Sequence, residues 1–294
     1  MDKEPLVYIN GEYYPKSQAK ISVFDHGLLY GDGVFEGIRA YNGVVFKLKE
    51  HVDRLYRSAH PLMLKIQLTK EQMIEAVLET LRRNNMRDAY IRLVVTRGAG
   101  DLGLDPHKCP KPTVFIITGA IVLHGNEAKK KGITALISWV RRNPVDTTSH
   151  EIKSLNYLNS VMAKIEANGA GDDEAICLDK NGYISEGVGE NLFIVKNGKI
   201  FTPPNSSGAL PGITAEVTKR LAAKLGYDVA EGNLTPYQLL TADEAFFTGT
   251  AAEVVPIREV NKRQIGKGLP GPVTKKLIEA FEKVVLDPAE GVPI

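Results

Sequence analysis

The chain has 294 residues, of which 43% are hydrophobic and 24% are charged. These values exclude a disordered or low-complexity protein, and the length suggests two compact domains. Lys and Arg number 37 against 35 Asp and Glu, and the two signs are interspersed along the chain. The charge pattern therefore favours neither nucleic acid nor a membrane surface as a partner, and we expect a small molecule instead.

The cysteines and the N-terminus indicate the compartment. Cys109 and Cys177 lie far apart and show no CxxC spacing, which argues against a zinc site or a disulfide scaffold. We expect no metal ion and a reducing environment. The N-terminal residues MDKEPLVYING lack the apolar segment of a signal peptide, and no run approaches the roughly 18 apolar residues of a membrane span. We therefore predict a cytoplasmic protein.

The N-terminal part has the patterns of an α+β domain. Residues 6–14 and 42–48 resemble short strands with Asn-Gly turns, which predicts hairpins. Thr69 and Gln72 form a capping box ahead of the amphipathic run TKEQMIEAVLETL, which predicts a helix. The segment AYIRLVVT at 89–96 alternates between apolar and polar side chains, so we expect a strand with one polar face.

The second half is richer in short strands. After an apolar run at 113–119, the polar, charged and Gly-flanked segment 124–132 is typical of an inter-domain connection. Beyond it, strand-like runs such as EAICLD and EAFFTGT alternate with helical runs, which predicts α+β structure and a possible barrel. The periodicity predicts helices at 155–167, 214–225 and 272–285.

Lys153 immediately precedes the first of these predicted helices. Asn168-Gly169 is a plausible C-cap, so the lysine would lie near the positive end of a helix of about 13 residues. The helix dipole and the apolar surroundings would both favour a neutral amine, which Schiff-base chemistry with a carbonyl cofactor requires. The alternative is a solvated surface lysine at a helix start.

The segment GYISEGVGENLF places Glu186 and Glu190 around a Gly-Val-Gly sequence. Two glycines let the backbone approach something flat or bulky, and a carboxylate facing that gap could pair with a protonated ring nitrogen. A glycine-rich turn with a surface glutamate is the alternative.

Two further segments could bind phosphate. ALPGIT leads into a helix that begins at Thr214, and a helix N-terminus offers free N–H groups and positive dipole to an anion. The Thr-Gly-Thr turn in FFTGT offers a second set of N–H and hydroxyl donors. Thr214 as a plain N-cap is an equally good interpretation of the first segment.

Candidate substrate-binding residues lie in the N-terminal part. The segment DHGLLYGDGVFEGIRAYNG is dense in glycine and aromatic residues, which suits either a pocket wall or a tightly packed hairpin. Tyr90 and Arg92 place a hydroxyl and a fixed cation on one strand face, a pair suited to a substrate carboxylate. An ordinary surface ion pair is the alternative for Arg92.

These motifs occur together in one order along the chain. The segments YGDGVFEGIRAY, AYIRLVVTRGAGDLGLDP, IKSLNYL, GYISEGVGENLF, ALPGIT and FFTGTAAEVVPIREV make the sequence similar to fold-type IV enzymes that use pyridoxal phosphate (PLP), and within them to the branched-chain amino acid aminotransferases. The resemblance covers about residues 6–285. It implies an α+β fold with a small N-terminal α/β sandwich domain and a larger C-terminal domain with a barrel-like sheet. The expected limits are 1–120 for the first domain, 121–132 for the linker and 133–294 for the PLP-anchoring domain.

The resemblance implies a role for each matching position around the cofactor. Lys153 would carry PLP as a Schiff base and move the proton, and Glu186 would pair with the pyridine nitrogen. Tyr157 would lie near the phenolic oxygen, and Arg54 would bind the phosphate. Leu210 and Gly189 would contact the ring faces, while Ile213, Thr214 and Thr250 would complete the phosphate site.

The resemblance also implies the substrate site and the assembly. Residues around the side-chain and carboxylate pockets would be Phe35, Gly37, Tyr90, Arg92, Thr250 and Ala251, and Tyr30 and Leu104 would reach the neighbouring subunit's site. We therefore expect a homo-oligomer, at least a dimer, with a hexamer as an alternative that the resemblance allows. The predicted reaction moves the amino group of L-leucine, L-isoleucine or L-valine to 2-oxoglutarate by a ping-pong mechanism through Lys153.

Departures from the family pattern bear on substrate breadth. Thr118 and Ile121 stand where some members place aromatic residues, and Lys153 and Tyr157 are one residue closer than in some branched-chain enzymes. A D-amino acid aminotransferase, an R-amine transaminase or an aminodeoxychorismate lyase of the same fold type remains an alternative. From other classes, a non-catalytic binder of PLP or another phosphate ligand, or an α+β protein without cofactor, also remains open.

Overall fold

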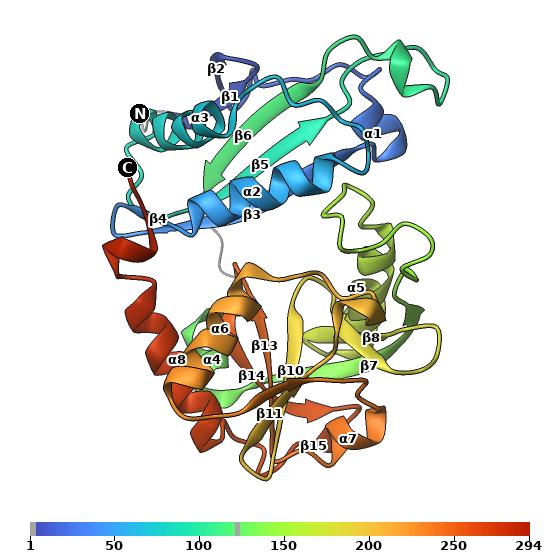
Figure 1. Ribbon diagram of the computed structural model, residues 1–294, viewed down its shortest axis with the longest axis vertical. Coiled ribbons are helices and arrows are strands. Elements are labelled where there is room, and N and C mark those ends of the chain that lie inside the picture. The colour runs from blue at the N-terminus through green and yellow to red at the C-terminus, as the bar shows by residue number, and fades with distance from the viewer. Residues whose placement is uncertain (1–3, 121–123) are drawn as a thin grey trace. The chain divides into compact units, whose positions relative to one another are not determined.

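The computed structural model describes residues 4–120 and 124–294. The chain divides into two compact units (Figure 1). Unit 1 comprises Met1–Ile121, Ile152–Asn156 and Val285–Ile294, and unit 2 comprises Val122–Glu151 and Tyr157–Val284.

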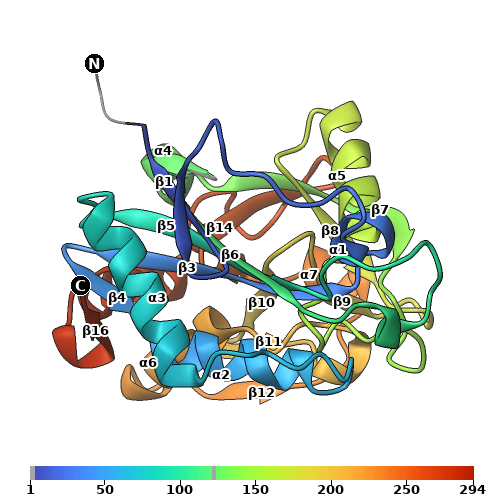
Figure 2. The ribbon, with the colours of Figure 1, turned by 90° about the horizontal axis from the view of Figure 1, so that it is seen from above.

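Unit 1 contains an antiparallel sheet with helices packed on one face. Its strand order is β16-β4-β3-β5-β6-β1-β2, and every neighbouring pair is antiparallel. Figure 2 shows β5 and β6 side by side, with α3 beside β1. The strands are β1 Leu6–Ile9, β2 Glu12–Pro15, β3 Gly33–Tyr41, β4 Val44–Phe46, β5 Ala89–Thr96, β6 Thr113–Gly119 and β16 Gly291–Pro293, and the helices are α1 His26–Tyr30, α2 Leu48–Ala59, α3 Lys70–Arg83 and the 3-10 turns Pro106–Lys108 and Pro288–Glu290.

Local sequence signals explain these elements. Asn10-Gly11 and Asn42-Gly43 adopt positive φ in the turns that close the β1–β2 and β3–β4 hairpins, so both predicted hairpins are confirmed. The capping box that begins α3 is confirmed as well, with Thr69 and Gln72 bonded to each other's backbone.

The alternation in β5 sorts its side chains between the two faces of the sheet. Ile91, Leu93 and Val95 are fully buried in the core under α2 and α3, while Tyr90 and Arg92 lie on the opposite face. The prediction of one polar face is therefore confirmed, and that face carries the candidate substrate residues.

Unit 2 contains a mixed, curled sheet. Its order is β12-β11-β10-β13-β14-β7-β8-β9, with β15 on β14, and β9 also contacts β10. This agrees with the expected barrel-like sheet (Figure 1). The strands are β7 Ile133–Arg141, β8 Glu174–Leu178, β9 Ile184–Gly187, β10 Asn191–Lys196, β11 Lys199–Thr202, β12 Val229–Glu231, β13 Glu244–Gly249, β14 Glu253–Val260 and β15 Arg263–Gln264. The helices are α4 Gly125–Lys131, α5 Leu158–Ala170, α6 Ile213–Lys224, α7 Pro236–Leu240, α8 Pro272–Val284 and the 3-10 turn Asn205–Ser207.

The helix after Lys153 begins later than its periodicity predicts. The expected range was 155–167, whereas α5 spans Leu158–Ala170 and ends on Gly171 in the left-handed conformation. The reason is that residues 152–156 run along β3: the Phe35 N–H donates to the Lys153 carbonyl, and the Leu155 N–H donates to the Gly33 carbonyl. An extended segment cannot be helical, so the prediction that Lys153 lies at a helix N-terminus is wrong.

The same pairing gives unit 1 a segment that the sequence assigns elsewhere. Residues 152–156, and residues 285–294 with β16, belong to unit 1, although both lie in the range 133–294 expected for the C-terminal domain. In the expected linker 121–132, residues 121–123 lie outside the described residues, and 125–131 form α4.

The two long C-terminal helices agree with the sequence. α6 and α8 start and end within one residue of the predicted ranges 214–225 and 272–285. In the part of the chain that the structure describes, no helix is both long and apolar enough to cross a membrane.

Candidate active site

Lys153 lies in unit 1, on the strand-like segment beside β3. Its N–H donates to the hydroxyl of Ser58 on α2, and its Nζ lies 4.6 Å from the centroid of the Phe35 ring. Backbone pairing on one side and α2 on the other therefore fix the backbone of Lys153, and its Nζ faces an aromatic ring.

A buried ion network lies next to this lysine. The Nε and Nη2 atoms of Arg54 both donate to the carboxylate of Glu36, at 2.8 and 2.7 Å, and the Nδ1 of His51 is 2.7 Å from the same carboxylate. Burial raises the pKa of Glu36, but the charge and hydrogen bonds of Arg54 outweigh it and lower that pKa to about 2. Burial lowers the pKa of His51, and the charges of Arg54 and Lys153 act in the same direction. The two hydrogen bonds to Glu36 therefore hold the Arg54 side chain in one orientation.

The predicted substrate residues of β3 and β5 form one cluster. Gly37 pairs with Arg92 across the sheet, and an Arg92 Nη2–H donates to the Tyr90 hydroxyl at 2.9 Å. The guanidinium carbon of Arg92 lies 4.7 Å from the centroid of the Phe35 ring, which also faces Lys153. A Cβ at Gly37 would collide with the Tyr90 hydroxyl, so any larger residue there would displace the Tyr90 ring. The structure thus brings Phe35, Gly37, Tyr90, Arg92 and Lys153 together.

Tyr30 and Leu104 are placed differently. The Tyr30 hydroxyl donates to the carbonyl of Leu102 at 2.5 Å, and the Leu104 side chain is 77% exposed. Both belong to the surface formed by α1 and the loop after β5, and neither is part of the cluster around Phe35.

Glu186 is a buried carboxylate at the end of β9 in unit 2. It accepts a hydrogen bond from the Leu210 N–H at 2.9 Å and one from the Asn191 side chain at 3.4 Å. Arg142 and His150 lie at ion-pair distances of 3.4 and 3.1 Å from its other oxygen. Burial raises the pKa of Glu186, but the Arg142 charge, His150 and the Leu210 N–H together lower it below the ordinary value. The carboxylate is therefore held in its charged form.

The residues around Glu186 were not found from the sequence. Arg142 is 1% exposed and donates to Ser160 and to the Gly187 carbonyl, and the His150 ring lies 5.2 Å from the Tyr157 ring. The sequence does not reveal these partners of Glu186, because each lies in a segment far from Glu186 along the chain.

Glu36 and His51 were missed as well, although a signal existed. In GVFEGIRAY the inward positions of β3 carry Val34, Ile38 and Ala40, all in the core, and Glu36 shares their face. A charged residue at an apolar position of a strand requires a buried partner. The partners are His51 and Arg54, which lie three residues apart in HVDR and so share one face of the neighbouring helix α2.

The predicted phosphate residues of α6 lie at its N-terminus. The helix begins at Ile213, its N-cap Gly212 has no side chain to bond the first-turn N–H groups, and Thr214 is 6% exposed. Leu210 lies just ahead, with its N–H on Glu186 and its carbonyl bonded to Asn191. The start of α6 is thus tied to Glu186 and offers backbone donors to an anion.

Thr250, Ala251 and Gly189 occupy turns at strand ends. Thr250 and Ala251 form the turn of the β13–β14 hairpin, and Gly189 lies in the bend between β9 and β10. A Cβ at Gly189 would meet no atom within 4 Å, so its neighbourhood is open. Unit 2 thus holds Tyr157, Glu186, Gly189, Leu210, Ile213, Thr214, Thr250 and Ala251, and unit 1 holds the remaining predicted residues.

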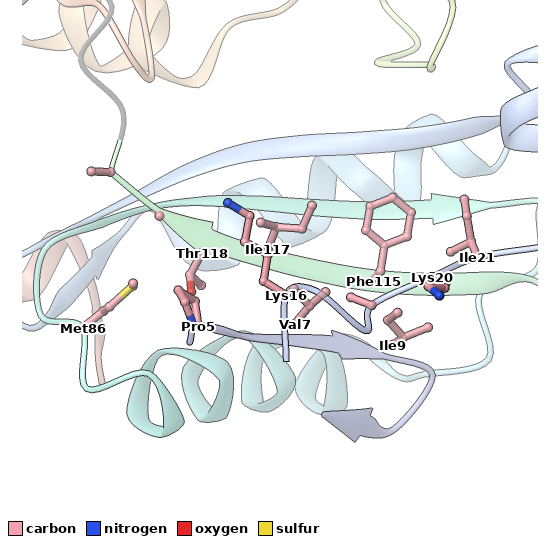
Figure 3. A pocket seen from close by; sticks show the side chains of 13 residues that line it. Pro5, Val7, Ile9, Lys16, Lys20, Ile21, Met86, Phe115, Ile117 and Thr118 are labelled. Atoms are coloured by element: carbon pink, nitrogen blue, oxygen red, sulfur yellow. The ribbon is translucent and has the colours of Figure 1, made fainter. Parts of the chain in front are cut away.

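Unit 1 also has a cavity of about 650 Å³ over β1 and β6. Figure 3 shows apolar side chains such as Val7, Phe115 and Ile117 lining it, together with Lys16 and Lys20. None of the predicted site residues is among the described residues that line it. Two of its lining residues, Ile117 and Gly119, are the cross-strand partners of Arg92 and Tyr90.

Comparisons with known proteins agree with one another. Residues 33–260 match the model of the family "Amino-transferase class IV". A Methanocaldococcus jannaschii protein, provisionally named a branched-chain-amino-acid aminotransferase, is 58% identical over 279 residues, which cover 95% of this chain and 96% of that protein.

Solved structures give the same result. The Escherichia coli branched-chain amino acid aminotransferase superposes with a TM-score of 0.94 at 41% identity, covering 96% of this chain and 95% of that one. The branched-chain amino acid aminotransferase of T.th., complexed with N-(5'-phosphopyridoxyl)-L-glutamate, superposes with a TM-score of 0.90 at 42% identity, covering 96% and 94%. The chain therefore belongs to the class IV aminotransferases and, within them, to the branched-chain amino acid aminotransferase family.

Proposed function

We propose that this protein is a PLP-dependent transaminase that moves the amino group of L-leucine, L-isoleucine or L-valine to 2-oxoglutarate. Support comes from its family and from the T.th. relative, whose bound compound joins the cofactor to glutamate, the amino product of 2-oxoglutarate. The observation that carries the proposal is the buried carboxylate of Glu186, which Arg142, His150 and the Leu210 N–H keep charged.

Glu186 fits the ring end of the cofactor. When bound, PLP acts as an electron sink, and it does so best when its ring nitrogen is protonated. A carboxylate whose pKa is lowered stays charged at neutral pH and so stabilises a positive charge on that nitrogen. Gly189 leaves open space nearby for a flat ring.

The phosphate end fits the start of α6. Backbone N–H groups without a side-chain cap, the buried Thr214 and the Thr250 turn supply donors for a dianion. Arg54 would add a cation whose orientation Glu36 fixes through two hydrogen bonds.

Lys153 is proposed as the covalent attachment point and as the base. Its Nζ would receive the proton from the substrate Cα and pass it to the cofactor carbon within the same half-reaction, and the second half-reaction would run this transfer in reverse. The pairing of residues 152–156 with β3 supports this role, because it gives the lysine a fixed backbone and leaves the side chain beside Phe35.

Arg92 and Tyr90 are proposed to bind the substrate carboxylate. The buried Nε of Arg92 has no hydrogen-bond partner among the described residues, which suits a guanidinium that awaits an anion. Phe35 beside it would contact the aliphatic side chain.

We also propose a cytoplasmic homo-oligomer, at least a dimer. Support comes from α5, whose Leu158, Met162 and Ile165 are 72%, 39% and 58% exposed along one face, while Ala163 and Ala167 face the sheet. Exposed apolar side chains at helical spacing are typical of a subunit interface. Tyr30 and Leu104, proposed to reach a neighbouring site, are exposed as well.

The experiment is steady-state kinetics with the purified holoenzyme. We expect parallel double-reciprocal lines for L-leucine against 2-oxoglutarate, because the two substrates react in alternate half-reactions. Intersecting lines would contradict that mechanism. A panel of D-amino acids and R-amines measured with the same 2-oxoglutarate tests the substrate class, and a higher kcat/KM for any of them than for the L-branched-chain set would contradict it.

A further inference from the structure

A second cluster of titratable residues lies in unit 2, apart from the groups assigned above. It consists of His124 just before α4, Glu174 at the start of β8 and Glu190 just before β10. One ligand-type atom from each residue lies within 4.8 Å of the other two. His124 Nε2 is 3.0 Å from Glu190 Oε1.

The cluster is buried, and one of its oxygens is unsatisfied. Glu174 and Glu190 are 4% and 3% exposed, and the His124 side chain is 9% exposed. Glu190 Oε2 has no hydrogen-bond partner within the described part of the chain, although a buried carboxylate oxygen without one carries a large desolvation penalty. Each such oxygen in a native protein requires an explanation, and an absent cation is one.

The cation that pairs with Glu174 is partly exposed and lies at the limit of an ion pair. Lys164 Nζ lies 3.9 Å from Glu174 Oε2, but the side chain of that lysine is 38% exposed and also donates to the Asp173 carbonyl. His124 forms its hydrogen bond with Glu190.

The chemistry of the donor set suits a transition-metal ion. Imidazole and carboxylate ligands together bind Zn²⁺, and three protein ligands plus water make a four-coordinate site. Donors about 2.0–2.1 Å from Zn²⁺ in a tetrahedral site lie roughly 3.3 Å apart, so the His124–Glu190 spacing is already suitable. Glu174 Oε1 accepts from the Ala175 and Val188 N–H groups, which hold that side chain in place.

We propose that His124, Glu174 and Glu190 form a binding site for a divalent cation, Zn²⁺ in the first instance. The ion joins the start of α4 to β8 and to the bend that carries Gly189. None of its three ligands is given a role in the proposed reaction. The proposal is independent of the proposed function, so failure of either leaves the other standing.

The test measures zinc bound to the holoenzyme after removal of metals with EDTA, incubation with Zn²⁺ at pH 8 and gel filtration. We expect one tightly bound zinc ion per chain in the wild type, and its loss in both His124→Gln and Glu190→Gln. His107→Gln is the matched control, because His107 is an exposed imidazole beside a carboxylate, with an 86% exposed side chain, and lies outside the cluster. That variant should bind as much zinc as the wild type.

Thermal unfolding provides a second readout that does not depend on activity. We expect Zn²⁺ to raise the unfolding temperature of the wild type and of H107Q but not of H124Q, while all three unfold cooperatively in EDTA. Equal zinc content in the wild type and H124Q, no tightly bound zinc in either, or an equal Zn²⁺-dependent shift in both would overturn the proposal.

Discussion

Buried charged partners fix the side chains of Arg54 in unit 1 and Glu186 in unit 2. Glu36 fixes Arg54 through two hydrogen bonds, and Arg142 with His150 keeps Glu186 charged. In each case a group proposed to contact the cofactor has its orientation set by a partner that makes no proposed contact with the cofactor. Such preorganisation reduces the reorganisation that binding requires.

The Glu36 network predicts a pH-dependent stability. The folded-state pKa of Glu36, about 2, lies below its unfolded value, so the carboxylate stabilises the fold above pH 4.5 and this contribution, about 3 kcal/mol, is lost as the pH falls toward 2. Glu36→Gln breaks the buried ion pair between Glu36 and Arg54, which should destabilise the protein by about 3–5 kcal/mol at pH 7. Calorimetric unfolding temperatures of the wild type and the variant from pH 7 to pH 2 check this.

The control for that measurement is Glu50→Gln, which removes a half-exposed carboxylate from the first turn of α2. Its unfolding temperature should stay close to that of the wild type at every pH. If E36Q lost stability toward pH 2 as steeply as the wild type, Glu36 would not be the group that titrates.

Substitution of Arg92 should weaken substrate binding rather than destabilise the fold. Arg92→Gln removes the cation proposed to bind the substrate carboxylate, so we expect kcat/KM for L-leucine to fall about 10- to 100-fold, the effect of a charge-assisted hydrogen bond of about 1.5–3 kcal/mol. Arg82→Gln, which removes an exposed guanidinium from α3, should leave kcat/KM unchanged. Equal kinetics in R92Q and the wild type would rule out the assigned role.

At the scale of elements, local sequence signals predict the helices, strands and turns that depend on nearby residues alone. The Asn-Gly hairpins, the Thr69 capping box, the alternating strand β5 and the helices α6 and α8 follow from turn chemistry, capping and periodicity. The start of α5 could not be predicted in this way, because backbone pairing of residues 152–156 with β3, more than a hundred residues away, overrides the helical pattern.

The candidate site shows the same division. Lys153 and Glu186 were named from the sequence, through motif order and resemblance. Arg142, His150 and Glu36 were not, because each is defined by a partner brought close only by folding. Ion-pair partners that are distant along the chain show no characteristic spacing in the sequence.

The turn before α6 predicts a backbone-sensitive position. A Cβ at Gly212 would collide with the Asn191 side chain, which bonds both Glu186 and the Leu210 carbonyl. Gly212→Ala should therefore disturb the Glu186 carboxylate and raise the Kd for PLP about tenfold or more. Titration of the cofactor-free protein with PLP, followed by absorbance, measures this.

Gly169→Ala is the matched control, because Gly169 lies within α5 and a Cβ there meets no atom within 4 Å. It should leave PLP affinity unchanged and stabilise the helix by about 0.5–1 kcal/mol. Similar PLP affinities in G212A and G169A would refute the link between Gly212 and Glu186.

At the scale of the whole molecule, the proposed roles are divided between the units. Unit 1 supplies Lys153, Arg54 and the carboxylate-binding pair, and unit 2 supplies Glu186 and the α6 terminus. Neither unit alone contains every group that the proposed reaction requires.

Assembly can be tested through α5. Ile165→Glu places a charge on the exposed apolar face of that helix, so we expect a smaller sedimentation coefficient than that of the wild type if a second copy covers this face. Met63→Glu, at a 79% exposed apolar residue of unit 1, is the control and should sediment as the wild type does. An unchanged coefficient in I165E would exclude α5 from the interface.

The most direct test of the central claim is a single half-reaction. Holoenzyme mixed with L-leucine and no 2-oxo acid should lose the visible absorbance of lysine-bound cofactor and release one 2-oxo acid per site, and 2-oxoglutarate should restore the absorbance. Lys153→Ala should do neither. Conversion by D-amino acids or R-amines but not by L-leucine, or an unimpaired half-reaction in K153A, would contradict the assignment of a branched-chain transaminase that works through Lys153.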